Sequence, residues 1–379
     1  MFKKQEKAGR EGVESMRSEK RCLFCGISIT FILCWLIFLI GCGANELENH
    51  AFPLALGVEK TSDDDLEIYM AYPDLQDENA ADNALSSDVF WKGKGSDLFE
   101  GKERMSANSN KNADFNHLKV LILDQAILED TTKTEQLLHF FQEEQDAAWN
   151  TYVMLTEEPL DEIFSDDLDL PESLGIYLED LLEEWEDVRQ GGQVTAGTLM
   201  SQYYEKNETL CAPVLEISDA EEKPEISGFC VLTGLQPKGK LSLQEGEQMM
   251  LVQNSLKRYS FSMRDGTRFS MEQIQTERKI ELVSDESGNS YPLLTVTVRG
   301  NSTVSALSWN TDQESVLQQG KQELADRLLT LLVTQQKNAG CDLANSFLLL
   351  AGQERSLWEQ YEKSPEQYIS DVRIRLFVE

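Results

Sequence analysis

The stretch "FNHLKVLILDQAILED", residues 115–130, holds a largely apolar run between two polar flanks. Leu118 to Leu123 predicts a β-strand buried on both faces, because a short apolar run without polar alternation is typical of a sheet covered on both sides. A helix is predicted from about Thr134 to Asp146, and another strand at Tyr152–Leu155. This succession of strand and helix predicts an α/β-like or α+β first domain.

Two strands joined by a turn are predicted before this stretch. The apolar segment Phe52–Val58 forms the first, and alternating apolar residues from Leu66 to Tyr72 form the second, with a turn at Thr61–Asp65. Residues 74–115 are rich in Asp, Asn, Ser, Gly and Lys. We expect a variable loop there, with one weak helix over Ser96–Ala107.

The second half of the chain alternates helices with hairpins. Ser242–Glu245 and Thr311–Glu314 are capping boxes that each predict a helix start, and a boundary is expected near residue 220. A terminal strand is predicted from the alternation of Val372 to Val378. Two hairpins are predicted from paired apolar segments around turn residues, namely Tyr259–Met263 with Thr267–Met271, and Lys279–Val283 with Leu293–Val298.

The segment Glu157–Asp187 contains fourteen acidic residues and no basic one. Its apolar residues from Leu174 to Val188 recur at helical spacing, which predicts an amphipathic helix with carboxylates on the solvent side. A cation-binding surface is the alternative. No segment has the alternating Asp/Asn and Gly of a calcium loop, so we favour the solvated helix face.

Length suggests the number of domains, and charge argues against one class of partner. The 379 residues suggest two or three domains, and the net charge of −33 opposes binding to nucleic-acid phosphates. We therefore expect no nucleic-acid partner.

The N-terminus has the composition of a secretion signal. Leu23 to Ile40 carries no charge, and seven basic residues precede it: Lys3, Lys4, Lys7, Arg10, Arg17, Lys20 and Arg21. A positive segment followed by an apolar one directs the rest of the chain out of the cytoplasm. A permanent membrane anchor is the alternative, since about 20 apolar residues can span a bilayer.

Leu39-Ile40-Gly41-Cys42 matches the bacterial lipobox. Small Gly41 would admit the peptidase, and the Cys42 thiol would carry a diacylglycerol as the first residue of the mature protein. Two acyl chains give stable anchoring. We therefore expect residues 1–41 to be a cleaved lipoprotein signal peptide and residues 42–50 to be a lipidated neck.

Three cysteines remain in the mature chain, Cys211, Cys230 and Cys341. One disulfide with a free thiol and three buried thiols are both compatible with this number, and we favour the buried thiols. Cys22 and Cys25 form a C-x-x-C pattern, but within the signal segment.

Motifs of catalysis are missing from the sequence. It has no dinucleotide or nucleotide loop, no nucleophile elbow and no zinc-protease motif. His50, His117 and His139 do not stand at metal-ligand spacing. We expect no catalytic residues, no metal and no cofactor besides the lipid on Cys42.

Several segments in order resemble one family. They are Gly41-Cys42 with "ELENHAFPLALGV" (46–58), "HLKVLIL" (117–123), "LCAPVLEI" (210–217), "ISGFCVLTGLQPKGKLSLQEGEQMMLVQN" (226–254), and then Gln335-Gln336-Lys337, Asp342, Trp358 and Tyr368. Together they resemble the Ger(x)C spore germination lipoproteins, the C subunits of nutrient germinant receptors. Gly43 and Ala44 replace the usual Trp and Asp, Gln142 replaces a common Arg, and a closing Gly is absent.

The resemblance implies a non-catalytic, lipid-anchored subunit on the outer face of the spore's inner membrane. Its partners would be a polytopic nutrient-sensing A subunit and a transporter-like B subunit. The implied fold is α+β with about three domains of mixed and antiparallel sheets packed with helices. We expect an N-terminal germination-protein domain at 51–217, a middle α+β domain at 218–305 and a C-terminal helix and strand domain at 306–379.

Two other classes compete with this interpretation. An extracytoplasmic solute-binding or structural envelope lipoprotein would also be secreted and acidic, but solute binding would predict repeated βα units in two lobes. An envelope enzyme is disfavoured by the missing nucleophile and metal motifs.

Overall fold

The computed structural model describes residues 50–73, 88–107, 109, 111–144, 148–218, 220–305 and 312–379. Residues Ala51–Glu379 form one compact unit. None of the helices in the described ranges has the length and hydropathy of a membrane span. Cys42, the signal peptide and all of the neck except His50 lie outside the described residues.

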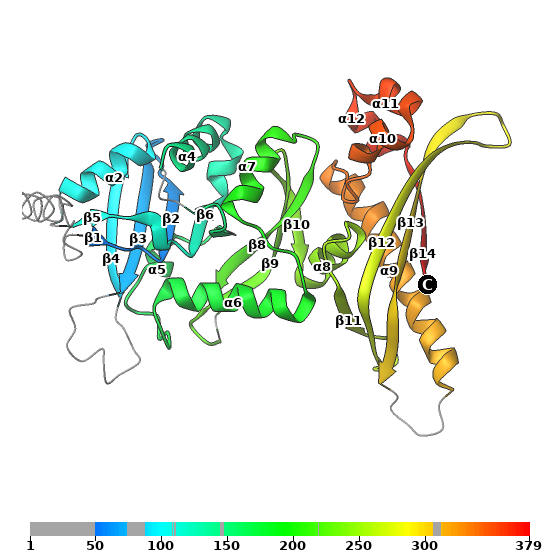
Figure 1. The fold of residues 1–379 in the computed structure, drawn as a ribbon, viewed down its shortest axis with the longest axis horizontal. Helices are drawn as coiled ribbons and strands as arrows, with labels where there is room; N and C mark the ends of the chain where they lie inside the picture. The colour runs from blue at the N-terminus through cyan, green and yellow to red at the C-terminus, as the bar shows by residue number, and fades with distance from the viewer. Residues whose placement is uncertain are drawn as a thin grey trace, which may run out of the picture. The chain divides into compact units, whose positions relative to one another are not determined.

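An eight-stranded mixed sheet forms the first half of this unit (Figure 1). The order across the sheet is β10 (Gln236–Ser242), β9 (Pro224–Thr233), β8 (Thr209–Ile217), β7 (Tyr152–Thr156), β6 (Val120–Asp124), β2 (Ala55–Lys60), β3 (Leu66–Pro73) and β4 (Asp88–Gly95). The central strands β2, β6, β7 and β8 are parallel, and the outer pairs are antiparallel. The short strands β1 (His50–Ala51) and β5 (Asn112–Ala113) lie outside it.

Strand β6 is buried on both faces, as the opening stretch predicts. Leu121 and Leu123 belong to the core on one face, whereas Val120 and Ile122 belong to the core on the other. All four side chains are at most 1% exposed. The first face is covered by α2 (Leu98–Ala107), α3 (Gln125–Glu129), α4 (Thr131–Glu143) and α7 (Ala196–Tyr204), and the second by α5 (Leu160–Ile163) and α6 (Leu174–Arg189).

A second sheet of four strands forms the C-terminal half. Its order is β11 (Arg258–Ser262), β12 (Arg268–Ser284), β13 (Ser290–Ser305) and β14 (Arg373–Val378), with β14 parallel to β13. The third core lies between this sheet and helices, and strands β8, β9 and β10 of the large sheet also contribute buried residues to it. Those helices are α8 (Leu243–Val252), the long α9 (Gln313–Ala339), α10 (Phe347–Gln353), α11 (Arg355–Tyr361) and α12 (Pro365–Asp371).

Local sequence signals predicted many of these elements correctly. Both predicted hairpins of the second sheet form, and the terminal strand is β14. Ser242 and Glu245 form the predicted capping box of α8, with both reciprocal hydrogen bonds. The first strand pair, β2 and β3, also forms as predicted.

Two strands and one cap differ from the sequence prediction. Residues 74–115 contain β4, whose glycines and lysines have a composition that disfavours a strand. Gly93 and Gly95 allow helix α2 to approach this strand closely. A Cβ on Gly95 would lie only 2.5 Å from Gly101 N of α2. Strand β10 also differs from the prediction, because its glycine, proline and lysines likewise disfavour a strand. Helix α9 begins after Asp312 without a side-chain cap, and Thr311 lies outside the described residues.

The predicted domain boundaries remain predictions. The boundary after residue 217 falls between β8 and β9, which pair side by side in the large sheet. The boundary after residue 305 follows the last residue of β13.

Helix α6 crosses the second face of the large sheet, and its start is fixed from outside the helix. Asp88 Oδ2 accepts a hydrogen bond of 2.6 Å from Leu174 N, while the N-cap residue Ser173 makes no side-chain cap. Burial raises the pKa of Asp88 to about 6. The predicted amphipathic stripe is buried at Leu174, Leu178 and Leu182, but Val188 at its end is 57% exposed.

Substitution of Gly320 in α9 tests the packing of that helix against the second sheet. A Cβ at this position would collide with the Phe269 ring of β12, which is fully buried. We expect Gly320→Ala to lower the free energy of unfolding by about 1–3 kcal/mol, the usual cost of overpacking. Chemical denaturation of the purified protein measures this change.

Gly352→Ala is the matched control. A Cβ on Gly352, in α10, meets nothing within 4 Å. Because Ala favours a helix over Gly, this variant should be neutral or more stable by up to about 1 kcal/mol. Equal stability of the two variants would contradict the packing described for α9.

Candidate functional site

The sequence-marked residues Asp342 and Tyr368 meet in one buried polar network. Asp342 follows α9 and is 4% exposed, and its carboxylate accepts hydrogen bonds from Phe347 N (2.6 Å), Ala344 N (3.2 Å) and Ser346 Oγ (3.0 Å). Ser346 Oγ is also 2.8 Å from Tyr368 Oη. Burial raises the pKa of Asp342, and the backbone N–H donors oppose that rise. The carboxylate thus fixes the turn from α9 into α10.

Trp358, the third marked residue of this region, reaches the same place through an aromatic cluster. Phe347 packs against Trp358 with ring centroids 5.3 Å apart and against Tyr368 at 5.5 Å. Tyr361 contacts Tyr368 at 5.7 Å and donates a hydrogen bond of 2.9 Å to Asp371 Oδ2. The three short helices α10, α11 and α12 are therefore assembled around one ring, Phe347.

Asn345 in the same turn ties this region to the large sheet. Its side chain accepts a hydrogen bond from Thr209 N (2.7 Å) and donates one to Thr209 O (2.9 Å). Gln253 Nε2 donates to Thr209 O (2.9 Å) and to Leu343 O (3.0 Å). Asn345 has φ 49°, a left-handed conformation that Asn tolerates better than most residues. The start of β8 is thus held by two side-chain amides.

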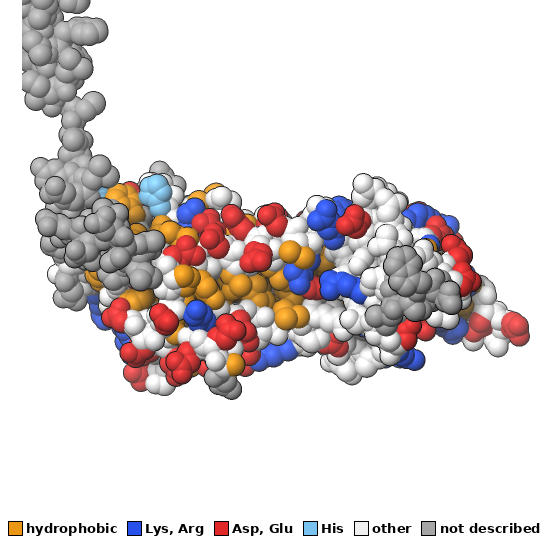
Figure 2. Space-filling view, turned by 90° about the horizontal axis from the view of Figure 1, so that it is seen from below, with side chains coloured by type: hydrophobic (Ala, Val, Ile, Leu, Met, Phe, Trp, Pro, Cys, Tyr) orange, Lys and Arg blue, Asp and Glu red, His pale blue; other side chains and the backbone are white. Residues whose placement is uncertain are grey.

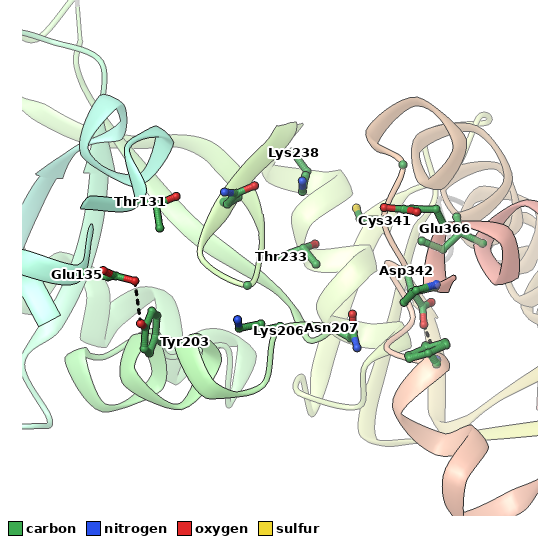
Figure 3. A pocket seen from close by; sticks show the side chains of 16 residues that line it. Thr131, Glu135, Tyr203, Lys206, Asn207, Thr233, Lys238, Cys341, Asp342 and Glu366 are labelled. Carbon is green, nitrogen blue, oxygen red and sulfur yellow. Dashed lines mark hydrogen bonds between the residues drawn. The ribbon is translucent and has the colours of Figure 1, made fainter. Parts of the chain in front are cut away.

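A pocket of about 370 Å³ opens beside this network (Figure 3). Polar side chains from segments far apart in the sequence line it, among them Asp342, Cys341 and four residues of the family segment 226–254. Its lining comprises Thr131, Glu135, Tyr203, Lys206, Asn207, Thr233, Gly234, Gln236, Lys238, Gly340, Cys341, Asp342, Phe347, Pro365, Glu366 and Ile369.

Charged groups of both signs face this pocket. Glu135 accepts a hydrogen bond of 3.1 Å from Tyr203 Oη. Lys206 and Lys238 form no ion pair within the part of the chain that the structure describes, and Glu366 stands opposite on α12. Such a lining can bind a small polar molecule through hydrogen bonds and charge. It was not predictable because its residues come together only in the fold.

The three cysteines of the described residues are buried. No disulfide joins them, and the thiols are free: Cys211, Cys230 and Cys341. This is the predicted alternative of three buried thiols. Burial raises the pKa of Cys341 to about 11 and that of Cys230 to about 12, so neither is an activated nucleophile. In the described ranges no group of three His, Cys, Asp or Glu side chains is arranged to hold a metal ion.

Comparison with known proteins gives the family. Residues 43–217 match the model of the spore germination protein N-terminal domain. The chain therefore carries the N-terminal domain of the spore germination proteins, which supports membership of the Ger(x)C family. This confirms the resemblance drawn from the sequence.

The fold of this germination protein is similar to a solved structure. The crystal structure of the GerBC protein matches it with a TM-score of 0.53, at 12% sequence identity, over 85% of this chain and 95% of that chain. No curated protein matches the chain. The predicted α+β class with mixed and antiparallel sheets is confirmed.

Removal of the Asp342 carboxylate tests the buried network. Asp342→Ala leaves Phe347 N and Ala344 N without an acceptor in the protein interior. We expect a loss of about 3 kcal/mol in the free energy of unfolding, since each buried unpaired donor costs about 1–3 kcal/mol. Urea denaturation followed by tryptophan fluorescence provides the measurement.

Tyr368→Phe is the milder companion variant. It removes only the hydroxyl next to Ser346 and keeps the ring that packs on Phe347. The expected loss is about 1 kcal/mol. If Asp342→Ala proves no more damaging than Tyr368→Phe, the carboxylate does not fix the turn as described.

Proposed function

We propose that this germination protein is a lipid-anchored, non-catalytic subunit of a nutrient germinant receptor. A diacylglycerol on Cys42 holds it on the extracytoplasmic face of the spore's inner membrane. There it assembles with polytopic A and B membrane subunits and supports germination triggered by nutrients.

The position of the family match carries this proposal. The matched domain starts at residue 43, directly after the lipobox cysteine, and the charged and apolar segments of the predicted signal precede it. A secreted domain that begins immediately after a lipobox is the arrangement expected of a bacterial lipoprotein. Two acyl chains would then suffice for stable membrane attachment.

The chemistry of the described residues supports a binding or assembly role. The thiols are buried with raised pKa values, and the pocket next to Asp342 offers hydrogen-bonding and charged groups without an activated nucleophile. Interaction with partners therefore accounts for the site better than catalysis does.

Cys42→Ala tests the anchor and the role in germination together. Spores or sporulating cells carrying this variant should accumulate the unprocessed precursor, because the lipid acceptor is gone. We expect no incorporation of labelled palmitate into the protein and a slowing of nutrient-triggered germination by about tenfold or more. Gel mobility, lipid labelling and loss of spore refractility are the measurements.

Cys34→Ser is the matched control, since Cys34 lies in the same apolar segment but follows Leu33 rather than a small residue. It should be processed, labelled and active like the native protein. Normal labelling of Cys42→Ala would refute the anchor. Full nutrient-triggered germination with an unlabelled protein would refute the need for the anchor in germination.

A further inference from the structure

Helix α6 leaves part of its apolar surface uncovered. Tyr177, Leu181 and Val188 lie along one flank of the helix, next to the buried row of Leu174, Leu178 and Leu182. Tyr177 and Leu181 are half-buried, and Val188 is 57% exposed. Residues at spacings of four and seven share one side of a helix, so the three side chains lie along the same side of α6.

This apolar side continues onto the large sheet. Tyr177 Oη donates a hydrogen bond of 3.1 Å to Pro224 O at the start of β9. The half-buried Ile217 of β8 and Ile226 of β9 pack against the same core cluster as Tyr177 and Leu181. Together these five apolar residues, Tyr177, Leu181, Val188, Ile217 and Ile226, form what we call the α6 strip.

Carboxylates border the α6 strip on its solvent side. Asp180, Glu184 and Asp187 are exposed and form no ion pair in the described ranges, whereas Glu179 on the opposite flank pairs with Lys119 at 2.9 Å. In Figure 2, hydrophobic side chains gather on the face seen from below, where α6 lies in Figure 1, and many acidic and some basic side chains border them. An apolar strip with an acidic border is complementary to an apolar strip with a basic border.

We propose that the α6 strip is the docking site for a basic amphipathic helix of a partner protein. From Tyr177 to Val188 the strip extends over about 17 Å at 1.5 Å per residue, which matches about three turns of a partner helix. The apolar face of that helix covers Leu181 and Val188, and its Lys and Arg side chains reach Asp180, Glu184 and Asp187. Helices commonly bind in grooves in this way.

An anionic membrane surface is the less favourable occupant. The segment Glu157–Asp187 carries fourteen acidic residues and no basic one, so a negatively charged headgroup layer repels it. A protein helix with basic flanks instead gains from the same charges, and electrostatic complementarity also speeds association.

The test uses two fluorescent 18-residue peptides that share one leucine face. One carries lysines on its polar face, and the other carries glutamates at the same positions. The full-length protein is placed in nanodiscs of zwitterionic phosphatidylcholine, and fluorescence anisotropy measures binding after subtraction of empty nanodiscs. We expect the lysine peptide to bind with a Kd on the order of micromolar and the glutamate peptide not to bind.

Two variants of α6 and one control separate the contributions. Val188→Asp should weaken the lysine peptide about tenfold or more, and Leu282→Asp, at a 47% exposed residue of β12, should leave it unchanged. The triple variant Asp180→Asn, Glu184→Gln, Asp187→Asn changes only exposed side chains, so it keeps the fold. It should weaken binding about tenfold at low salt and flatten the salt dependence.

Several outcomes would overturn the proposal. They are no binding of the lysine peptide, equal binding of both peptides, or equal loss in Val188→Asp and Leu282→Asp. Binding of the protein to phosphatidylglycerol vesicles that Val188→Asp abolishes would assign the strip to a membrane surface instead. The membrane attachment is the same in every variant, because Cys42 is unchanged, so differences in peptide binding come from the substituted residues.

Discussion

The burial of strand β6 on both faces is the constraint on which the rest of the structure depends. Val120 and Ile122 need cover from α5 and α6, while Leu121 and Leu123 need cover from the helices of the opposite face. Because backbone groups at such depth must be paired, β6 also requires a strand on each side, β2 and β7. Helix α6 therefore lies against this face because it covers the apolar side chains of β6. Its uncovered flank is the side that faces away from the sheet.

The attachment of the C-terminal half to the large sheet uses polar contacts in addition to its apolar core. Thr209 at the start of β8 is held by the side-chain amides of Asn345 and Gln253, and Asn345 belongs to the turn that the Asp342 carboxylate fixes. Directional polar contacts of this sort specify one arrangement, whereas apolar contacts alone tolerate several. The pocket lies beside this turn, so its shape depends on the same polar contacts.

Local signals determined what could be predicted from the sequence. Strand β6, the hairpins and the α8 capping box carry their information in a few consecutive residues, and the family was recognised from the order of several short segments. Strands β4 and β10 were missed because glycine and lysine have low strand propensity, and both depend on pairing with a neighbour. Asp342 and Tyr368 were noted only as family markers; their contact through Ser346 requires the fold. The pocket lining could not be predicted because it combines distant segments, and of the α6 strip only the helical residues Tyr177, Leu181 and Val188 belong to the predicted amphipathic stripe.

Amide hydrogen exchange tests the central claim that the rest of the fold depends on the burial of β6. The amides of Ile122 and Leu123 should exchange only through global unfolding, because both neighbours of β6 must separate first. Amides at the distal end of the β12–β13 hairpin, such as that of Leu282, should exchange faster through local opening. Exchange of the β6 amides as fast as those of the hairpin end would contradict the account.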